Sequence, residues 1–328
     1  MLALADALPG LRRIDLTVNY RCPRPVVDRA VRLVANNEER FVKTIRAGPA
    51  AEGRLVLAPD GADETVRIRH VFERWPDDGR PRAILARTNA ELLPAAAVAL
   101  EMGLPFRAPR LRLLSEDRRV DAIIDAAAAI AAPGGDAPGG DAPGGDAPGG
   151  DAPLPRLAAL AVAGLEALAL PATSARPPRG APADADDREV DELLPLATGE
   201  LLAAVIGWAA PYRTLAELAS AVDRHRARIG ELRRDDALLT LATAHSTKGL
   251  EFDHVAVIGL DAGRFPSARS IREAPEPGRA LEEERRLAYV AWTRARRSLT
   301  LVFDPAAPSP FLLEAFSDAE LSLDGDYR

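Results

Sequence analysis

Several residue types that build common sites are scarce in this chain. The sequence has 328 residues but only one cysteine, Cys22, so neither an intramolecular disulfide nor a CxxC metal cage can form within it. None of its four histidines belongs to an HExxH pair, and we therefore expect no zinc hydrolase site. The G-x-x-x-x-G-K-[ST] sequence that cradles phosphate in P-loop ATPases is also absent. We therefore expect that this chain does not hydrolyse ATP alone.

Long apolar runs and a strong excess of positive charge are missing as well. The longest apolar stretch, residues 157–165, is shorter than the roughly 20 residues that cross a bilayer. The N-terminal region contains Asp6 and no basic leader, which is unlike a secretory signal. A net charge of −7 excludes a uniformly basic coat for nucleic acid but not a local basic patch. We expect a cytoplasmic protein with no membrane partner and, with 47% hydrophobic residues, a packed core.

Short strand-like segments alternate with helical ones in two parts of the chain. We expect strands at 14–18, 55–58, 83–86, 238–243, 255–259 and 299–303, and helices at 23–37, 63–75, 91–102 and 281–296. This alternation predicts an α/β fold with a largely parallel sheet and flanking helices. The sheet is expected to be split between residues 1–125 and 235–305.

Four tandem copies of Pro-Gly-Gly-Asp-Ala, at residues 133–152, interrupt this pattern. Such a segment cannot bury a core, so it predicts a disordered linker. Calcium-binding nonapeptide repeats also use Gly and Asp, but with another period. Alanine- and leucine-rich helical segments follow. We expect the α/β domain at 1–128 and 235–328, the repeat linker at 129–153 and a helical insertion at 154–234.

Polar side chains suited to chemistry gather in three segments: Asn19–Pro23, Thr243–Asp253 and Glu282–Ala295. In the first, Tyr20 and Arg21 follow a predicted strand, and the carboxyl edges of open α/β sheets are where ligands bind. The pair can stack a base and contact a phosphate, or it can belong to a helix-capping turn with exposed polar residues.

The second and third segments also allow alternatives. The second places His245, Lys248 and Glu251 in one loop after a strand, which is either a functional loop or a solvated polar one. Lys248 is one of only two lysines in the chain. In the third, Arg294 lies at the end of an apolar helical stripe. It can snorkel, reach across an interface or act as a helix C-terminal cation.

Taken together and in this order, the segments resemble the second motor domain, 2A, of superfamily 1A DNA helicases of the UvrD/Rep/PcrA type. Asn19-Tyr20-Arg21 resembles motif IV, Ala83–Asn89 motif IVa, Thr243–Asp253 motif V and Glu282–Ala295 motif VI. The resemblance covers about residues 1–125 and 235–305. It implies a RecA-like fold interrupted by a reduced helical insertion at the position of domain 2B.

Residue roles follow by position from this resemblance. It implies that Tyr20 stacks on adenine and Glu251 contacts the ribose. It further implies that the catalytic residues Arg21 and Arg294 reach the γ-phosphate of ATP, which is held with Mg²⁺ by a P-loop domain in trans. Residues expected to bind single-stranded DNA or couple it to the nucleotide are Arg87, Thr88, Asn89, Thr243, His245 and Lys248. No metal ligand is expected in this chain.

The sequence also departs from the family pattern. The Walker A and B residues and the adenine-reading glutamine have no counterpart, Cys22 stands where serine is usual, and Trp292 stands where a smaller residue is common. The leading hypothesis is the C-terminal half of an ATP-dependent UvrD-like helicase or translocase, as a split or truncated product. One alternative is a non-catalytic remnant that binds DNA or protein. Another is an α/β domain with an unrelated role.

Overall fold

The computed structural model describes residues 15–40, 44–49, 52–130, 152–163 and 198–321. The chain divides into two compact units. An α/β unit comprises Met1–Leu111 and Arg233–Arg328, and a helical unit comprises Arg112–Leu232. The Pro-Gly-Gly-Asp-Ala repeat lies almost entirely outside the described residues, as do the first residues of the strand expected at 14–18.

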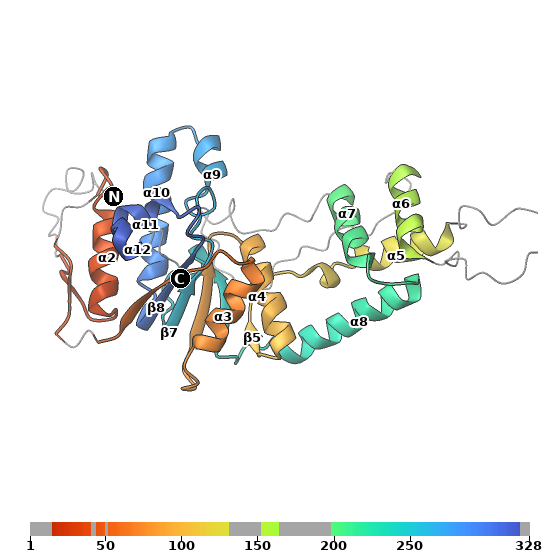
Figure 1. Cartoon of the computed structure of the whole chain (residues 1–328), viewed down its shortest axis with the longest axis horizontal. Helices are drawn as coiled ribbons and strands as arrows, with labels where there is room; N and C mark the ends of the chain where they lie inside the picture. Colours follow the sequence, from red (N-terminus) through yellow and green to blue (C-terminus); the bar gives the residue numbers. More distant parts are fainter. Residues whose placement is uncertain (1–14, 41–43, 50–51, 131–151, 164–197, 322–328) are drawn as a thin grey trace, which may run out of the picture. The chain divides into compact units, whose positions relative to one another are not determined.

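Six parallel strands form the main sheet of the α/β unit (Figure 1). Their order is β3 (Arg54–Pro59), β8 (Ala295–Phe303), β7 (Phe252–Val257), β4 (Arg82–Ala86), β6 (Leu239–Thr243) and β5 (Phe106–Arg107). Strands from the two parts of the chain interleave, so the sheet forms only when both parts come together. The expected parallel sheet, split across the helical insertion, is confirmed.

The two short strands β1 (Val18–Asn19) and β2 (Arg46–Ala47) pair only with each other. Tyr20 and Arg21 therefore follow β1 but do not lie at the carboxyl edge of the main sheet. That part of the sequence-based expectation is wrong, because a strand of two residues at this position does not join the six-stranded sheet.

Helices cover both faces of the main sheet (Figure 1). On one face lie α2 (Arg24–Val34), α10 (Pro277–Trp292), α11 (Pro310–Ala315) and α12 (Asp318–Leu321), and on the other lie α3 (Glu64–Arg74) and α4 (Asn89–Met102). A short helix, α9 (Ala268–Glu273), precedes α10. Apolar residues recur at helical spacing in α2, where Val26, Val27, Ala30 and Leu33 are buried. Helix α4 begins with a capping box of Thr88 and Glu91 and ends at Gly103 in the left-handed conformation.

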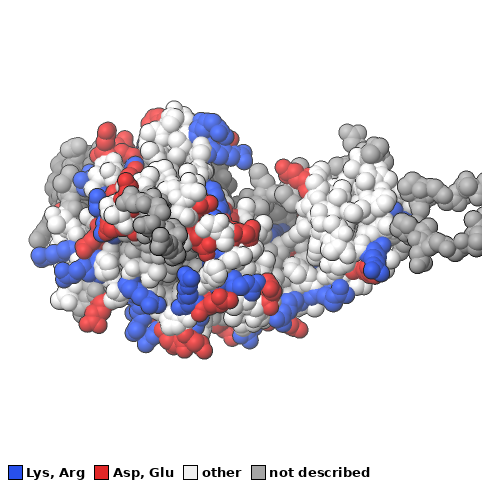
Figure 2. Space-filling view, viewed as in Figure 1, with Lys and Arg blue, Asp and Glu red and all other residues white. Residues whose placement is uncertain are grey.

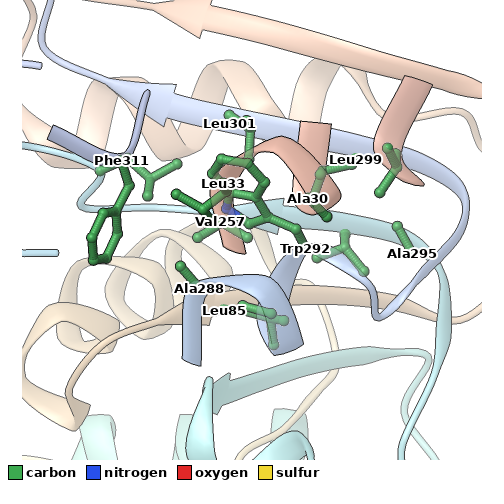
Figure 3. Close-up of a cluster of buried hydrophobic side chains, with 14 of the residues drawn as sticks. Ala30, Leu33, Leu85, Val257, Ala288, Trp292, Ala295, Leu299, Leu301 and Phe311 are labelled. Atoms are coloured by element: carbon green, nitrogen blue, oxygen red, sulfur yellow. The ribbon is translucent and has the colours of Figure 1, made fainter. Parts of the chain in front are cut away.

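Residues from α2, α10 and the sheet form one continuous core (Figure 3). Trp292, the largest fully buried side chain, packs in this cluster with Leu33, Leu301 and Val257. The central strands carry unbroken apolar runs, as in Ala83–Ala86, because helices bury both faces of the sheet. This core fixes the end of α10 against the strands.

The helical unit contains α5 (Arg119–Ala129), α6 (Pro153–Ala163), α7 (Thr198–Ala209) and α8 (Leu215–Leu232). Its own core includes Ile123, Leu157, Val205 and Leu218. Sequence patterning placed residues up to 128 in the α/β domain, whereas the structure starts the helical unit at Arg112. The difference arises because α5 buries its apolar face against α6 and α7.

Acidic and basic side chains are interspersed over the α/β unit on the face that Figure 2 shows. This agrees with the absence of a uniformly basic coat in the sequence. Among the described residues, no helix is long and apolar enough to cross a membrane.

We predict that Trp292→Ala lowers the free energy of unfolding by about 4 kcal/mol, because it leaves a large cavity in a close-packed core. Urea unfolding followed by far-UV circular dichroism measures this. The matched control is Leu313→Ala on α11, where the side chain is 46% exposed and the expected change is below about 0.5 kcal/mol. Equal losses in the two variants would contradict the assignment of Trp292 to the core.

Candidate functional site

The turn between β1 and α2 presents two side chains outward and anchors a third. The Asn19 Oδ1 atom accepts hydrogen bonds from the backbone N–H groups of Arg21 and Cys22, each at 2.9 Å. Cys22 is fully buried, and its Sγ donates to the carbonyl of Thr293 at 3.3 Å. Burial raises the pKa of the Cys22 thiol, which keeps it protonated as a donor. The turn is thereby attached to the end of α10.

Tyr20 points away from this anchor and is 79% exposed. The ring lies close over Gly48, where an added Cβ would be 2.9 Å from Cδ1 of the tyrosine. The backbone N–H of Gly48 also donates to the carbonyl of Asn19 at 2.8 Å. The glycine thus lets the chain pass close beneath an aromatic ring whose outer face is open for stacking.

Arg294 follows α10 and is held by main-chain acceptors. Its Nε donates to the carbonyl of Val290 at 3.0 Å, and its Nη1 donates to the carbonyls of Leu250 at 3.0 Å and Thr247 at 3.4 Å. No carboxylate pairs with this guanidinium among the described residues. Its positive charge is therefore oriented by neutral groups and not cancelled by an ion pair.

Arg21 lies near Arg294 but, unlike it, is paired with a carboxylate. Its Nε forms an ion pair with Glu251, which immediately follows Leu250. Burial lowers the pKa of Arg294, and the positive charge of Arg21 lowers it further. Two guanidinium groups that repel each other favour an anion between them, because the anion relieves the repulsion.

Beside these groups lies a cleft of about 1230 Å³, whose lining residues do not include Arg294. Its lining includes Tyr20, Arg21, Glu251, Tyr289 and Arg297. Residues at the starts of three strands also contribute: Arg54 in β3, His254 in β7 and Ser298 in β8. The cleft therefore opens at the amino edge of the main sheet, opposite to the edge that the sequence suggested. A volume of this order accommodates a small molecule.

The segment that links β6 to β7 runs from one edge of the sheet to the other. β6 ends at the carboxyl edge, where Thr243 is in register with Ala86, the last residue of β4. β7 starts at the amino edge, where His254 is in register with Arg82, the first residue of β4. The connecting residues 244–251 therefore begin at the carboxyl edge and bring Glu251 to the cleft at the amino edge.

The residues expected to contact DNA or couple it to the nucleotide lie on this segment or beside its start, at the carboxyl edge. Arg87, Asn89 and Thr243 are buried, Thr88 and His245 are half-buried, and Lys248 is exposed. The Thr88 hydroxyl caps α4 by accepting from the backbone N–H of Glu91 at 3.4 Å. The structure thus places most of these residues at the carboxyl edge, away from Tyr20, Arg21 and Glu251 at the amino edge. Lys248 is the exception, because it lies between Thr247 and Leu250, whose carbonyls accept from Arg294.

Sequence reasoning missed Glu284, which is 5% exposed and pairs with the buried Arg87. The helical periodicity of α10 indicates that position 284 is buried, because it lies on the same face as the buried residues Leu287, Ala288 and Ala291. Asn19 was part of a recognised segment, but its role in holding the turn required the structure. Within the described ranges, no group of three or more His, Cys, Asp or Glu residues is arranged to hold a metal ion.

Comparison with known families gives a match in the C-terminal part of the chain. Residues 212–304 match the family described as the UvrD-like helicase C-terminal domain. This match contains the segments around Glu251 and Arg294 and excludes Tyr20 and Arg21. It confirms the resemblance to the C-terminal half of a UvrD-like helicase over that range.

Individual relatives are named as DNA helicases. DNA helicase II of Escherichia coli is 54% identical over 63 residues, which are 19% of this chain and 8% of that protein. ATP-dependent DNA helicase PcrA of Bacillus subtilis is 52% identical over 63 residues, with the same two shares. Putative ATP-dependent DNA helicase YjcD of Bacillus subtilis is 27% identical over 332 aligned residues, which are 89% of this chain and 44% of that protein. The chain therefore spans less than half of the length of these relatives.

A solved structure, the C-terminal domain of a possible DNA helicase from Lactobacillus plantarum WCFS1, also matches. It has 13% identity and a TM-score of 0.35 over 91% of this chain and 95% of that chain. Similarity at this level carries no conclusion about the site.

We predict that Asn19→Ala lowers the free energy of unfolding by about 1 kcal/mol, because two backbone donors lose their shared acceptor. Urea unfolding checks the value. Asn19→Asp keeps an acceptor oxygen at the same place and is expected to lose less than about 0.5 kcal/mol. An aspartate variant as unstable as the alanine variant would show that the Oδ1 atom does not hold the turn.

Proposed function

We propose that this chain is the C-terminal motor half of an ATP-dependent UvrD-like DNA helicase or translocase. The observation that carries the proposal is the meeting of Arg21 and Arg294 at adjacent residues, since one binds the Glu251 carboxylate and the other the Leu250 carbonyl. The exposed ring of Tyr20 borders the same cleft. The similarity to UvrD-like helicases supports this reading of the cleft.

The residues at the amino edge fit a nucleoside triphosphate. Tyr20 offers an open aromatic face for adenine, and Glu251 offers acceptors for ribose hydroxyls. Arg21 and Arg294 supply positive charge for the γ-phosphate, where charge develops during phosphoryl transfer. A phosphate-binding loop that holds ATP and Mg²⁺ must come from residues outside this sequence, because the 328 residues contain no Walker A segment.

The carboxyl edge is the proposed side for single-stranded DNA. Thr88, His245 and Lys248 have accessible surface there or on the segment leading away from it. Binding through stacking and the phosphate backbone is sequence-tolerant and weakens with added salt. The segment 244–251 then connects the two sites, because it starts at the DNA side and ends at the nucleotide side. Closure of the cleft on ATP and its reopening after hydrolysis would move the strand stepwise.

We predict that the purified chain, mixed with ATP, Mg²⁺ and single-stranded DNA, shows no turnover above buffer. A coupled phosphate-release assay measures this. Co-expression with a helicase domain that carries Walker A and B segments is expected to restore DNA-stimulated hydrolysis. Robust turnover by the chain alone would contradict a half-motor, and DNA binding without any restored hydrolysis would favour a non-catalytic binding module.

In the restored enzyme, we predict that Arg294→Ala reduces turnover by roughly 10³-fold or more, as expected for an arginine finger. DNA affinity, measured by fluorescence anisotropy, should change much less because Arg294 lies at the amino edge. The control is Arg269→Ala on α9, where the guanidinium is exposed and pairs only with Glu273 among the described residues. Equal losses of turnover and DNA affinity in Arg294→Ala would count against the assigned role.

A further inference from the structure

A buried ion pair joins the carboxyl end of β4 to the helix that leads to Arg294. Arg87 donates from Nη2 to Oε1 of Glu284 at 2.6 Å, and from Nε to Oε1 at 2.8 Å and Oε2 at 2.9 Å. The two side chains are only 3% and 6% exposed. Such a pair in a water-poor site is strongly directional, and removing one partner leaves an uncompensated charge.

Glu284 also holds a neighbouring segment. Its Oε2 accepts a hydrogen bond from the backbone N–H of Ser267 at 3.0 Å, and Arg87 Nη2 donates to Ser270 Oγ at 3.4 Å. One carboxylate therefore ties together the end of β4, the start of α9 and the body of α10.

The main chain of Arg87 belongs to the cap of α4. The backbone N–H groups of Arg87 and Thr88 both donate to Oε2 of Glu91 at 3.0 Å. Thr88 and Asn89 are among the residues proposed to face DNA or couple it. A displacement of this cap by DNA would therefore move the guanidinium that Glu284 holds.

Helix α10 carries such a displacement to the other edge. From Glu284 to Trp292, where α10 ends, is eight residues, or about 12 Å along the helix axis, and Arg294 follows two residues later. On this path Leu287, Ala288, Ala291 and Trp292 are buried in the core (Figure 3). A close-packed interior is nearly incompressible, so the helix moves as a rigid body and not by local bending.

We infer that Arg87 and Glu284 are positioning residues that couple the DNA side of the sheet to the arginine at the nucleotide side. The inference rests on the proposed function. Neither residue lines the cleft at the amino edge, and the burial of Arg87 favours coupling, one of the two roles that the family resemblance left open for it.

The experiment uses Trp292 as an internal reporter, because it is fully buried two residues before Arg294. Trp75→Phe and Trp208→Phe in the full chain leave it as the sole tryptophan. Its emission is recorded with and without a saturating oligo(dT) of about 20 nucleotides. In the parent, we expect DNA to change the emission of Trp292.

Glu284→Gln keeps the shape of the side chain and an acceptor for Ser267 but removes the charge. We expect it to lose most of the DNA-induced change, while the dissociation constant for oligo(dT) shifts by less than about threefold. Glu314→Gln is the matched control, since Glu314, on α11, pairs with Arg285, the neighbour of Glu284 on α10. The control should retain the change. Arg87→Lys keeps the positive charge without the planar fork and provides a second test should Glu284→Gln fail to fold.

The outcomes separate the inference from the proposed function. Absence of oligo(dT) binding in the parent would overturn the proposed function and, with it, the inference. Binding without any change in Trp292 emission would overturn the inference alone, as would a full change in Glu284→Gln or in Arg87→Lys. Loss of the change in Glu314→Gln as well would show a general loosening of α10 and would also overturn it.

Discussion

Hydrogen bonds hold helix α10 and the residues that follow it at both edges of one parallel sheet. The arrangement of the candidate site depends on these contacts. At the middle of α10, Glu284 binds Arg87 beyond the carboxyl end of β4. Just past its end, Arg294 donates to main-chain carbonyls of the segment that leads to Glu251. Because the core between these points is close-packed, the distance between the two edges is held by a rigid element. Contacts at the carboxyl edge therefore help to set the geometry of the cleft at the amino edge.

The two arginines near Glu251 differ in how their charge is balanced. Arg294 is oriented by neutral carbonyls, so in the proposed complex a phosphate would meet its charge without breaking an ion pair. Arg21 is paired with Glu251, so the same phosphate would compete with a carboxylate for it. That pair is about two-fifths exposed on both sides, and exposed pairs contribute little to stability. Under the proposed function, exchange of Glu251 for a phosphate would therefore cost little free energy and would free the carboxylate for other hydrogen bonds.

The sequence was sufficient where structure is dictated by local pattern. The central strands and the helices α2, α3, α4 and α10 were predictable from apolar periodicity. The sequence alone could not predict contacts between residues that lie far apart along the chain. The pairing of Arg87 with Glu284 joins positions 197 residues apart, so nothing local distinguishes a buried arginine from a surface one. The helical pattern of α5 does not show to which unit the helix belongs. That depends on the residues against which its apolar face packs, and these lie in the helical unit.

Two of the departures from the family pattern, Cys22 and Trp292, have one physical explanation. Both side chains are fully buried in the same core, and the Cys22 thiol donates to the carbonyl of Thr293, which adjoins Trp292. The thiol makes a weaker hydrogen bond than a hydroxyl but loses less when it is removed from water, and an indole fills a larger interior volume. These substitutions therefore change packing behind the cleft, whereas the groups that border it, Tyr20, Arg21 and Glu251, are the residues that the resemblance requires. Variation in the interior is compatible with an unchanged surface because the Asn19 Oδ1 atom, which accepts from the backbone N–H groups of residues 21 and 22, sets the direction of the turn whatever side chain stands at position 22.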